Sequence, residues 1–268
     1  MKTSLKDLII SILSSIISGI IVNTMNASKP LNIPTTWMAF AIAILVGVCV
    51  YLSLFVMRCR AHGIIKILGS SIKGEGSTES YMKAATHSIQ FVGIASSKWV
   101  NNADLLERTI RSICSQNTGY IKFLLLNPKS EAAQKLTLAQ NSPNEQTVSQ
   151  KIEHSLNLLN GIINRISDNN VDLLNKFEIR LYNQMPVYRL TIIDERRAYF
   201  CFYQKGCDGS KLKQFVIKPK VNSDLSQENI FNSMSEYFDS LWTSKETISY
   251  KITNQNDNGG ILNVNTPN

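Results

Sequence analysis

Two long apolar stretches near the start of the chain set it apart from an ordinary soluble sequence. No Lys, Arg, Asp or Glu occurs between Asp7 and Lys29, or between Lys29 and Arg58. A helix of about 20 apolar residues spans the roughly 30 Å core of a bilayer. We therefore predict a transmembrane hairpin with spans at about 8–26 and 36–57. The alternative for the first segment is a signal peptide, but its apolar run is long and no Ala-x-Ala cleavage site follows it.

The flanking charges predict the orientation of this hairpin. Positive side chains precede the first segment and follow the second, whereas the connecting loop carries only Lys29. Those outer cations are Lys2, Lys6, Arg58, Arg60 and Lys66. The excess of positive charge at both outer ends places both termini in the cytoplasm. The five cysteines have no paired spacing, so we expect neither a disulfide nor a metal site.

Small residues recur at every fourth position in both apolar segments. They are Ser11, Ser15 and Gly19 in the first, and Ala39, Ala43 and Gly47 in the second. Small side chains let helix backbones approach closely in lipid, where packing replaces the hydrophobic effect. We predict that these faces pack helices together, either within one hairpin or between protomers of a homo-oligomer.

Beyond the hairpin, the pattern of apolar positions becomes that of an α/β domain. We expect a juxtamembrane helix that continues through Ile64–Leu68 to residue 69, a Gly-rich linker at 70–77, the domain at 78–248 and a disordered tail at 249–268. The predicted helices are 78–88, 104–114, 131–140, 145–166 and 227–242, and the predicted strands are 89–94, 120–126, 177–182, 188–193, 198–203 and 214–217. Strand–helix–strand order at the front implies parallel pairing, and the later cluster of strands implies a mixed sheet.

The net charge of +8 is unevenly distributed. Residues 189–220 hold eight Lys or Arg against three carboxylates, whereas residues 221–268 hold two against six. Such a basic block can attract phosphate or anionic lipid head groups. The alternative is a solvated face that the acidic C-terminal region partly neutralises.

Catalytic motifs are scarce. The three histidines, His62, His87 and His154, lie apart in the sequence, and no metalloprotease, P-loop, dinucleotide-binding or nucleophile-elbow motif occurs. We therefore expect no cofactor and no metal.

One segment resembles a known signature. The run Val187-Tyr-Arg-Leu-Thr-Ile-Ile-Asp194 precedes a turn and a second strand. This arrangement resembles the signature strand of the phospholipase D superfamily, in which His is followed by Lys two residues later and then by Asp. Val187 stands at the His position, Arg189 at the Lys position and Asp194 at the Asp position. The segments 92–98 and 121–128 also resemble that family, so the resemblance spans about residues 78–220, one copy of a domain that active members use in pairs.

The resemblance implies a phosphate-binding fold without its nucleophile, because valine can neither attack phosphorus nor carry a proton. Arg189 could still bind a phosphate with two hydrogen bonds, held in place by Asp194. The candidate ligand-binding residues are Ser96, Ser97, Lys98, Arg189, Asp194, Arg196 and Arg197, the first three because they follow a strand's carboxyl end. The alternative is that Arg189 and Asp194 form a purely structural ion pair next to a polar turn.

The whole architecture resembles the two-transmembrane effectors of bacterial anti-phage systems, including retron-type systems. That resemblance implies an inner-membrane protein held inactive by a partner, such as a reverse transcriptase with its RNA–DNA product, or gated by a nucleotide signal. Once released, it would oligomerise and disrupt the lipid bilayer without acting as an enzyme. Two alternatives stay open: an anchor that recruits nucleic acid or protein to the membrane, and a membrane-bound phosphodiesterase.

Overall fold

The computed structural model describes residues 35–69, 74–139, 146–167, 175–203, 212–219 and 229–250. The chain divides into two compact units, Met1–Val56 and Met57–Asn268. The predicted span at 8–26 and nearly all of the predicted tail at 249–268 lie outside the described residues. In the first unit, the description begins with helix α2.

Helix α2 (Thr35–Ala61) contains the whole of the predicted apolar segment 36–57. Its side chains are described at Ala41 and from Ile44 to Arg60, and large apolar side chains on all sides of that part are exposed. They are Ile44, Val46, Val48, Val50, Tyr51, Leu52, Leu54, Phe55 and Met57. Among the residues that the structure describes, none of the helices is both long enough and apolar enough to cross a membrane.

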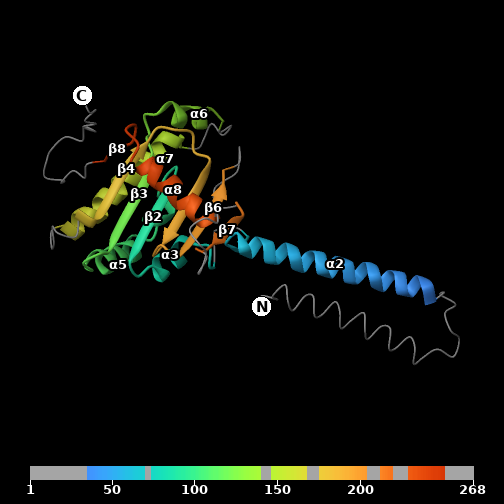
Figure 1. The fold of residues 1–268 in the computed structure, drawn as a ribbon. Coiled ribbons are helices and arrows are strands. Elements are labelled where there is room, and N and C mark those ends of the chain that lie inside the picture. The colour runs from blue at the N-terminus through green and yellow to red at the C-terminus, as the bar shows by residue number, and fades with distance from the viewer. Residues whose placement is uncertain are drawn as a thin grey trace. The chain divides into compact units, whose positions relative to one another are not determined.

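The second unit is built on one mixed sheet (Figure 1). The described strands follow the order β1-β7-β6-β5-β2-β3-β4-β8, in which β2, β3 and β4 are parallel and all other neighbours are antiparallel. Their bounds are β1 (Ile64–Leu68), β2 (Ser88–Gly93), β3 (Tyr120–Leu126), β4 (Phe177–Tyr182), β5 (Tyr188–Ile193), β6 (Arg197–Phe202), β7 (Gln214–Ile217) and β8 (Ile248–Ser249). This confirms the predicted α/β class with a mixed sheet.

Helices cover both faces of the sheet. Their bounds are α3 (Thr78–Ala84), α4 (Ser97–Val100), α5 (Ala103–Cys114), α6 (Glu131–Ala139), α7 (Val148–Ser167) and α8 (Ile230–Trp242). On the face that we call the α3/α4 face, Trp99 lies 5.4 Å from Phe91 and 5.1 Å from Phe123, measured between ring centroids. Helix α8 covers the opposite face, which we call the α8 face (Figure 1). There, the ring centroid of Tyr237 lies 4.5 Å from that of Tyr188. The central strand β2 is therefore buried along its full length.

The prediction of a helix through Ile64–Leu68 is wrong, because α2 ends at Ala61 and this segment is the edge strand β1. Gly63 makes the break: its φ is +88°, and a Cβ there would lie 2.8 Å from the Lys218 carbonyl oxygen. The run of β-branched residues then pairs antiparallel with β7.

The start of the α/β domain therefore differs from the predicted one. The second unit begins at Met57 rather than at residue 78, because β1 belongs to its sheet. Of the predicted linker 70–77, residues 74–77 are described, and Ser77 caps α3 by accepting a hydrogen bond from the Ser80 amide at 3.2 Å. The helix expected to reach residue 88 ends at Ala84, and the short helix α4 lies in the expected loop.

Candidate functional site

Strand β5 carries the two residues that the sequence joins into one motif, and it holds them at opposite ends. Asp194 begins the turn that leads into β6. The turn has positive φ angles at Asp194 (52°) and Glu195 (53°), with the Arg196 amide donating to the Ile193 carbonyl at 3.0 Å. Positive φ at two successive turn residues is typical of tight hairpins, and Asp tolerates it better than most residues.

The Asp194 carboxylate is fully engaged by the segment that begins β2. It accepts hydrogen bonds from the amides of Thr86 (3.0 Å), His87 (2.6 Å) and Ser88 (2.8 Å), and from the Thr86 hydroxyl (2.8 Å). Partial burial opposes the charged form, but the hydrogen bonds from Ser88, His87 and Thr86 outweigh it and hold the pKa of Asp194 below its usual value. Asp194 therefore fastens the hairpin to the central strand.

The expected contact between Arg189 and Asp194 does not form, either as a phosphate clamp or as a structural ion pair. The two residues are five positions apart, so their side chains project from opposite faces of the strand and are separated by roughly 16 Å along it. This correction removes Asp194 from the candidate ligand-binding set.

Arg189 lies on the α3/α4 face, where it belongs to a polar cluster with Tyr81, Gln214, Cys201 and Tyr203. With its amide assigned to suit its neighbours, Gln214 accepts from Arg189 Nη2 at 2.5 Å and donates to the Tyr81 hydroxyl oxygen at 2.7 Å. The Tyr81 hydroxyl in turn donates to the Gly76 carbonyl at 2.8 Å. Within the described part of the chain, no carboxylate forms an ion pair with Arg189.

Lys98 is a second cation near this cluster, and like Arg189 it acts electrostatically on the Cys201 thiol. Cys201 pairs with Arg189 across β5 and β6, and the Arg189 side chain hydrogen-bonds to its thiol. Burial raises the pKa of this thiol, whereas the charges of Arg189 and Lys98 act in the opposite direction. Lys98, on α4, is therefore close enough to act on the same atom as Arg189.

Tyr203 and Ser96 lie where the chain leaves β2. The Tyr203 hydroxyl accepts a hydrogen bond from the Ile94 amide at 3.2 Å. Burial raises the pKa of Tyr203 to about 12, and the charge of Arg189 opposes this rise. Ser96 is completely buried, and its hydroxyl has no hydrogen-bond partner in the structure. Ser96 lies past the carboxyl end of the parallel strand β2, and Tyr203 reaches the same place from the residue after β6.

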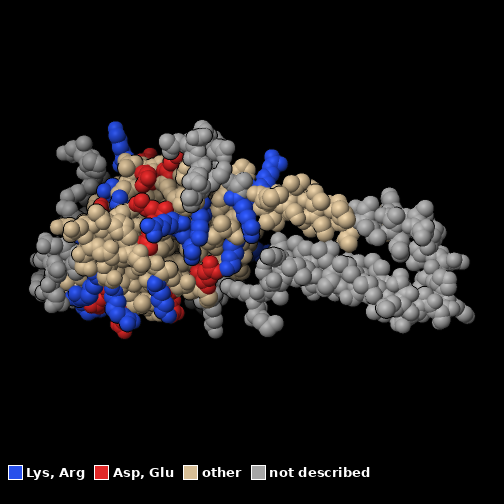
Figure 2. All heavy atoms as spheres, turned by 60° about the horizontal axis from the view of Figure 1, so that its bottom comes forward, with Lys and Arg blue, Asp and Glu red and all other residues tan. Residues whose placement is uncertain are grey.

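Of the remaining candidates, Ser97, Arg196 and Arg197 do not join the cluster. The Ser97 hydroxyl lies 3.1 Å from that of Ser155 on α7, an interaction between helices. Arg196 is exposed at the turn, and Arg197 donates to the Tyr199 hydroxyl at 3.2 Å. Both arginines lie at the end of β5 that is remote from Arg189, Arg196 in the turn and Arg197 paired with Ile193. Figure 2 shows that Lys and Arg also gather on the outside of the domain, with Asp and Glu among them.

The position that corresponds to the nucleophile of the phospholipase D signature holds an exposed, chemically inert side chain. Val187 is 54% exposed. His87 precedes β2 at the end remote from Arg189, and His154 is exposed on α7. Within the described residues, no group of three or more His, Cys, Asp or Glu side chains could hold a metal ion.

Four members of the cluster escaped the sequence analysis: Tyr81, Gln214, Cys201 and Tyr203. The signal available was weak. Tyr203 follows β6 directly, two positions after Cys201, and Gln214 is a polar residue that begins an otherwise apolar strand. Which residues of α3 and β7 face Arg189 depends on the strand order, which the sequence does not display.

The predicted helix-packing residues can be followed only in part. Ser11, Ser15 and Gly19 lie outside the described residues, as do the side chains of Ala39 and Ala43. Gly47 is described, and a Cβ added there would meet no atom within 4 Å. Among the described residues, none packs against the Gly47 face of α2.

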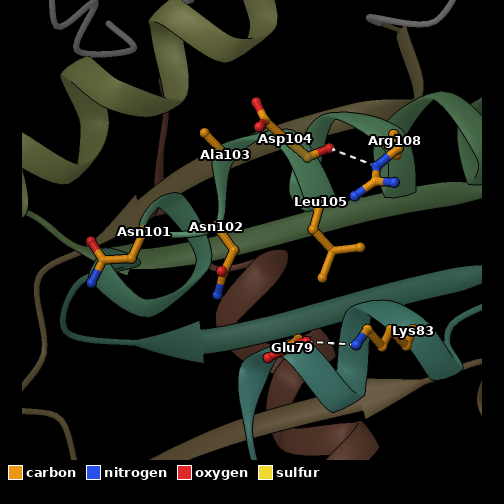
Figure 3. A pocket seen from close by; sticks show the side chains of 8 residues that line it. All are labelled: Glu79, Lys83, Asn101, Asn102, Ala103, Asp104, Leu105 and Arg108. Carbon is orange, nitrogen blue, oxygen red and sulfur yellow. Dashed lines mark hydrogen bonds and ion pairs between the residues drawn. The ribbon is translucent and has the colours of Figure 1, made fainter.

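A shallow depression of about 480 Å³ lies between α3 and the junction of α4 and α5 (Figure 3). Two of its charged side chains pair with each other, Lys83 with Glu79 at 2.6 Å, and Arg108 donates to the Asp104 backbone carbonyl at 3.2 Å. None of the predicted ligand-binding residues lines it.

Comparison with known proteins identifies no family. No family model matches the chain, and no curated protein matches it. Among solved structures, TrmBL2, an archaeal chromatin protein, is similar over 78% of this chain and 65% of its own, with 13% identity and a TM-score of 0.38. A phosphatidylserine synthase from Haemophilus influenzae is similar over 70% of this chain and 40% of its own, with 11% identity and a TM-score of 0.42. This chain thus spans less than two thirds of either protein.

Proposed function

We propose that the protein is a membrane-anchored effector. In this proposal the segments 8–26 and 36–57 form a hairpin in a bacterial inner membrane, and the α/β domain lies in the cytoplasm. The domain binds a phosphate-bearing ligand and thereby controls whether the hairpins assemble and disrupt the bilayer. A nucleotide, or the RNA–DNA product of a partner reverse transcriptase, is the ligand class that this proposal favours.

The observation that carries the proposal is the apolar surface of α2. Large apolar side chains from Ile44 to Met57 are exposed on every side of the helix. A helix that is apolar all round is stable only where lipid or protein surrounds it. Arg58 and Arg60 follow this surface directly, as the positive-inside rule expects at a cytoplasmic boundary.

The ligand class follows from the charges around Arg189. Arg189 and Lys98 act on one buried thiol, and within the described residues no carboxylate pairs with Arg189. Two cations at the carboxyl end of a parallel strand favour an anion, and guanidinium matches the geometry of phosphate oxygens. We infer binding without hydrolysis, because Val187 cannot replace a nucleophilic histidine.

A similarity to the phospholipase D superfamily belongs to the same proposal. It rests on the signature strand, on the position of Arg189 at the α3/α4 face and on Lys98 past the end of β2. The expected ligand site is then the place where that superfamily binds a phosphate group, with the catalytic imidazole missing.

Expression of the full chain in a bacterial host tests the effector role. We expect loss of membrane potential, followed by growth arrest. Gly47→Leu should weaken both effects, because Leu would hold apart helices that pack through the Gly47 face. Gly161→Leu is the matched control, since a Cβ at Gly161 of α7 also meets no atom within 4 Å. Normal potential and growth at full expression would contradict the proposal.

An anchor that recruits nucleic acid is the second candidate, favoured by the exposed Lys and Arg side chains of the domain (Figure 2). It predicts salt-dependent binding of nucleic acid that weakens on charge removal at Arg196, without membrane damage. The third reading, a phosphodiesterase, requires hydrolysis that Arg189→Ala abolishes.

A further inference from the structure

An apolar patch lies at the outer edge of the sheet, on the α8 face. We call it the β1-edge patch and define it as Ile67, Phe202 and Phe215. Ile67 is 60% exposed and Phe202 51%, whereas Phe215 is partly buried. Such a group of exposed apolar side chains on an edge strand indicates a binding surface or a risk of aggregation.

The strand register brings these side chains together. Ile67 pairs with Phe215, and Phe215 pairs with Phe200, so the three share one face. Phe202 follows Phe200 by two residues and projects from the same face. The ring centroids of Phe202 and Phe215 lie 6.4 Å apart. Helix α8 therefore leaves this end of its face uncovered.

Cations border the patch along the chain. Arg58 and Arg60 precede β1, and Lys213 and Lys218 flank β7, the strand beside it; all four are exposed. The amide of Lys218 donates to the Gly63 carbonyl at 3.1 Å, which fastens the end of β7 to the start of β1. Apolar side chains bordered by Lys and Arg are typical of surfaces that insert into an anionic membrane interface.

The chain itself limits how far the patch can lie from the end of α2. β1 begins three residues after Ala61, and an extended chain spans at most 3.3–3.6 Å per residue, so Ile64 lies within about 10 Å of Ala61 and Ile67 within about 20 Å. This step rests on the proposed function: if α2 crosses the bilayer and ends at its cytoplasmic boundary, β1 begins within the head-group region.

We propose that the β1-edge patch docks onto the anionic lipid surface around the protein's own membrane anchor. Pairing with the edge strand of a second copy is the less suitable alternative. The β1 register shifts between Ile64 and Lys66, and Lys66 pairs with Glu75. A bulge and a charged side chain within an edge strand both oppose further strand pairing. The docked surface would hold the domain against the membrane.

The test places an environment-sensitive label on Ile67→Cys in the full-length chain, with Cys49, Cys59 and Cys207 replaced by Ser. Cys114 and Cys201 are buried and stay. The labelled protein is reconstituted into vesicles of phosphatidylcholine alone and of phosphatidylcholine with phosphatidylglycerol. Leu138→Cys is the matched control, because Leu138 on α6 is also apolar and is 82% exposed.

We expect the label at position 67 to shift to shorter wavelength in the phosphatidylglycerol vesicles and to be quenched by a lipid-borne nitroxide. The label at position 138 should show neither effect. The double variant Lys213→Glu and Lys218→Glu should lose the response to phosphatidylglycerol.

Three outcomes would overturn the proposal. A label at position 67 that stays as water-exposed as the control means that the patch does not dock. Protection that rises with the protein-to-lipid ratio and escapes the lipid-borne quencher means that a second copy covers it. Release of the unlabelled full chain from membranes by alkaline carbonate would refute the anchor itself, so that failure is distinguishable from failure of docking alone.

Discussion

The two ends of strand β5 show that Arg189 and Asp194, which belong to one sequence motif, have different roles. At one end, the Asp194 carboxylate accepts four short hydrogen bonds from Thr86, His87 and Ser88. At the other, Arg189 has an amide, a thiol and phenols around it, and within the described residues no carboxylate forms an ion pair with it. A carboxylate that already accepts several hydrogen bonds from the protein has a structural role. A cation that pairs only with neutral groups can still bind an anion.

The largest effect should come from Asp194→Ala. It leaves three backbone amides and one hydroxyl without their acceptor, and hydrogen bonds to charged groups contribute about 1.5–3 kcal/mol each, not additively. We expect the free energy of unfolding to fall by about 3 kcal/mol, measured by denaturant titration of the full chain in detergent. Arg189→Ala, at the other end of the strand, should change it by less than about 1 kcal/mol. Equal losses at both ends would erase the distinction.

The next largest effect is on ligand affinity, and here the variant at the Arg189 end should have the effect. Arg189→Ala should weaken binding of ATP or of a short RNA–DNA hybrid by about 10- to 100-fold, the equivalent of one charge-assisted contact. Arg189→Lys should recover only part of this loss, because an ammonium cannot make the two parallel bonds of guanidinium. Titration of the full chain in detergent measures it, with Arg196→Ala as the control. Unchanged affinity in Arg189→Ala would show that the cluster is structural as well.

The pH dependence of stability should give the smallest difference between the Asp194 end and the Arg189 end of β5. The folded-state pKa of Asp194 lies below its ordinary value of 3.8, so its charge stabilises the fold fully above that value. This stability disappears as the pH falls through the lower, folded-state pKa. Unfolding midpoints should therefore fall more steeply with acid in the native chain than in Asp194→Asn, and Arg189→Ala should follow the native curve. Parallel curves for Asp194→Asn and the native chain would contradict a structural carboxylate.

Much of the sheet is predictable from short runs of apolar residues. The observed bounds of β3, β4, β5 and β7 equal the predicted ones, because each strand is a short run rich in apolar and β-branched or aromatic residues, alternating with charged ones in β4. β1 was missed since its partner, β7, lies far along the chain, and a run of isoleucines beside a helix fits the helical pattern equally well. Local periodicity contains no information about such a partner.

The candidate site was predictable to a smaller extent. The place of Lys98 past the carboxyl end of β2 follows from the strand–loop pattern, whereas Arg189 was selected by the resemblance of its strand to a signature. The supposed Arg189–Asp194 contact could have been rejected from spacing alone, because five is an odd number of residues on a strand. The neighbours Tyr81 and Gln214 could not be named, since they reach Arg189 from elements whose order in space only folding decides.

The hydrogen bonds between Asp194 and the residues before β2 join positions up to 108 residues apart. At 5–20 residues per second, a ribosome needs about 5–20 s to make that stretch. During this time the fully buried central strand β2 has left, or is leaving, the exit tunnel without the hairpin that fastens it. We expect chaperones to bind β2 until Asp194 has been synthesised. Slow codons before residue 194 would lengthen the time for which β2 is exposed.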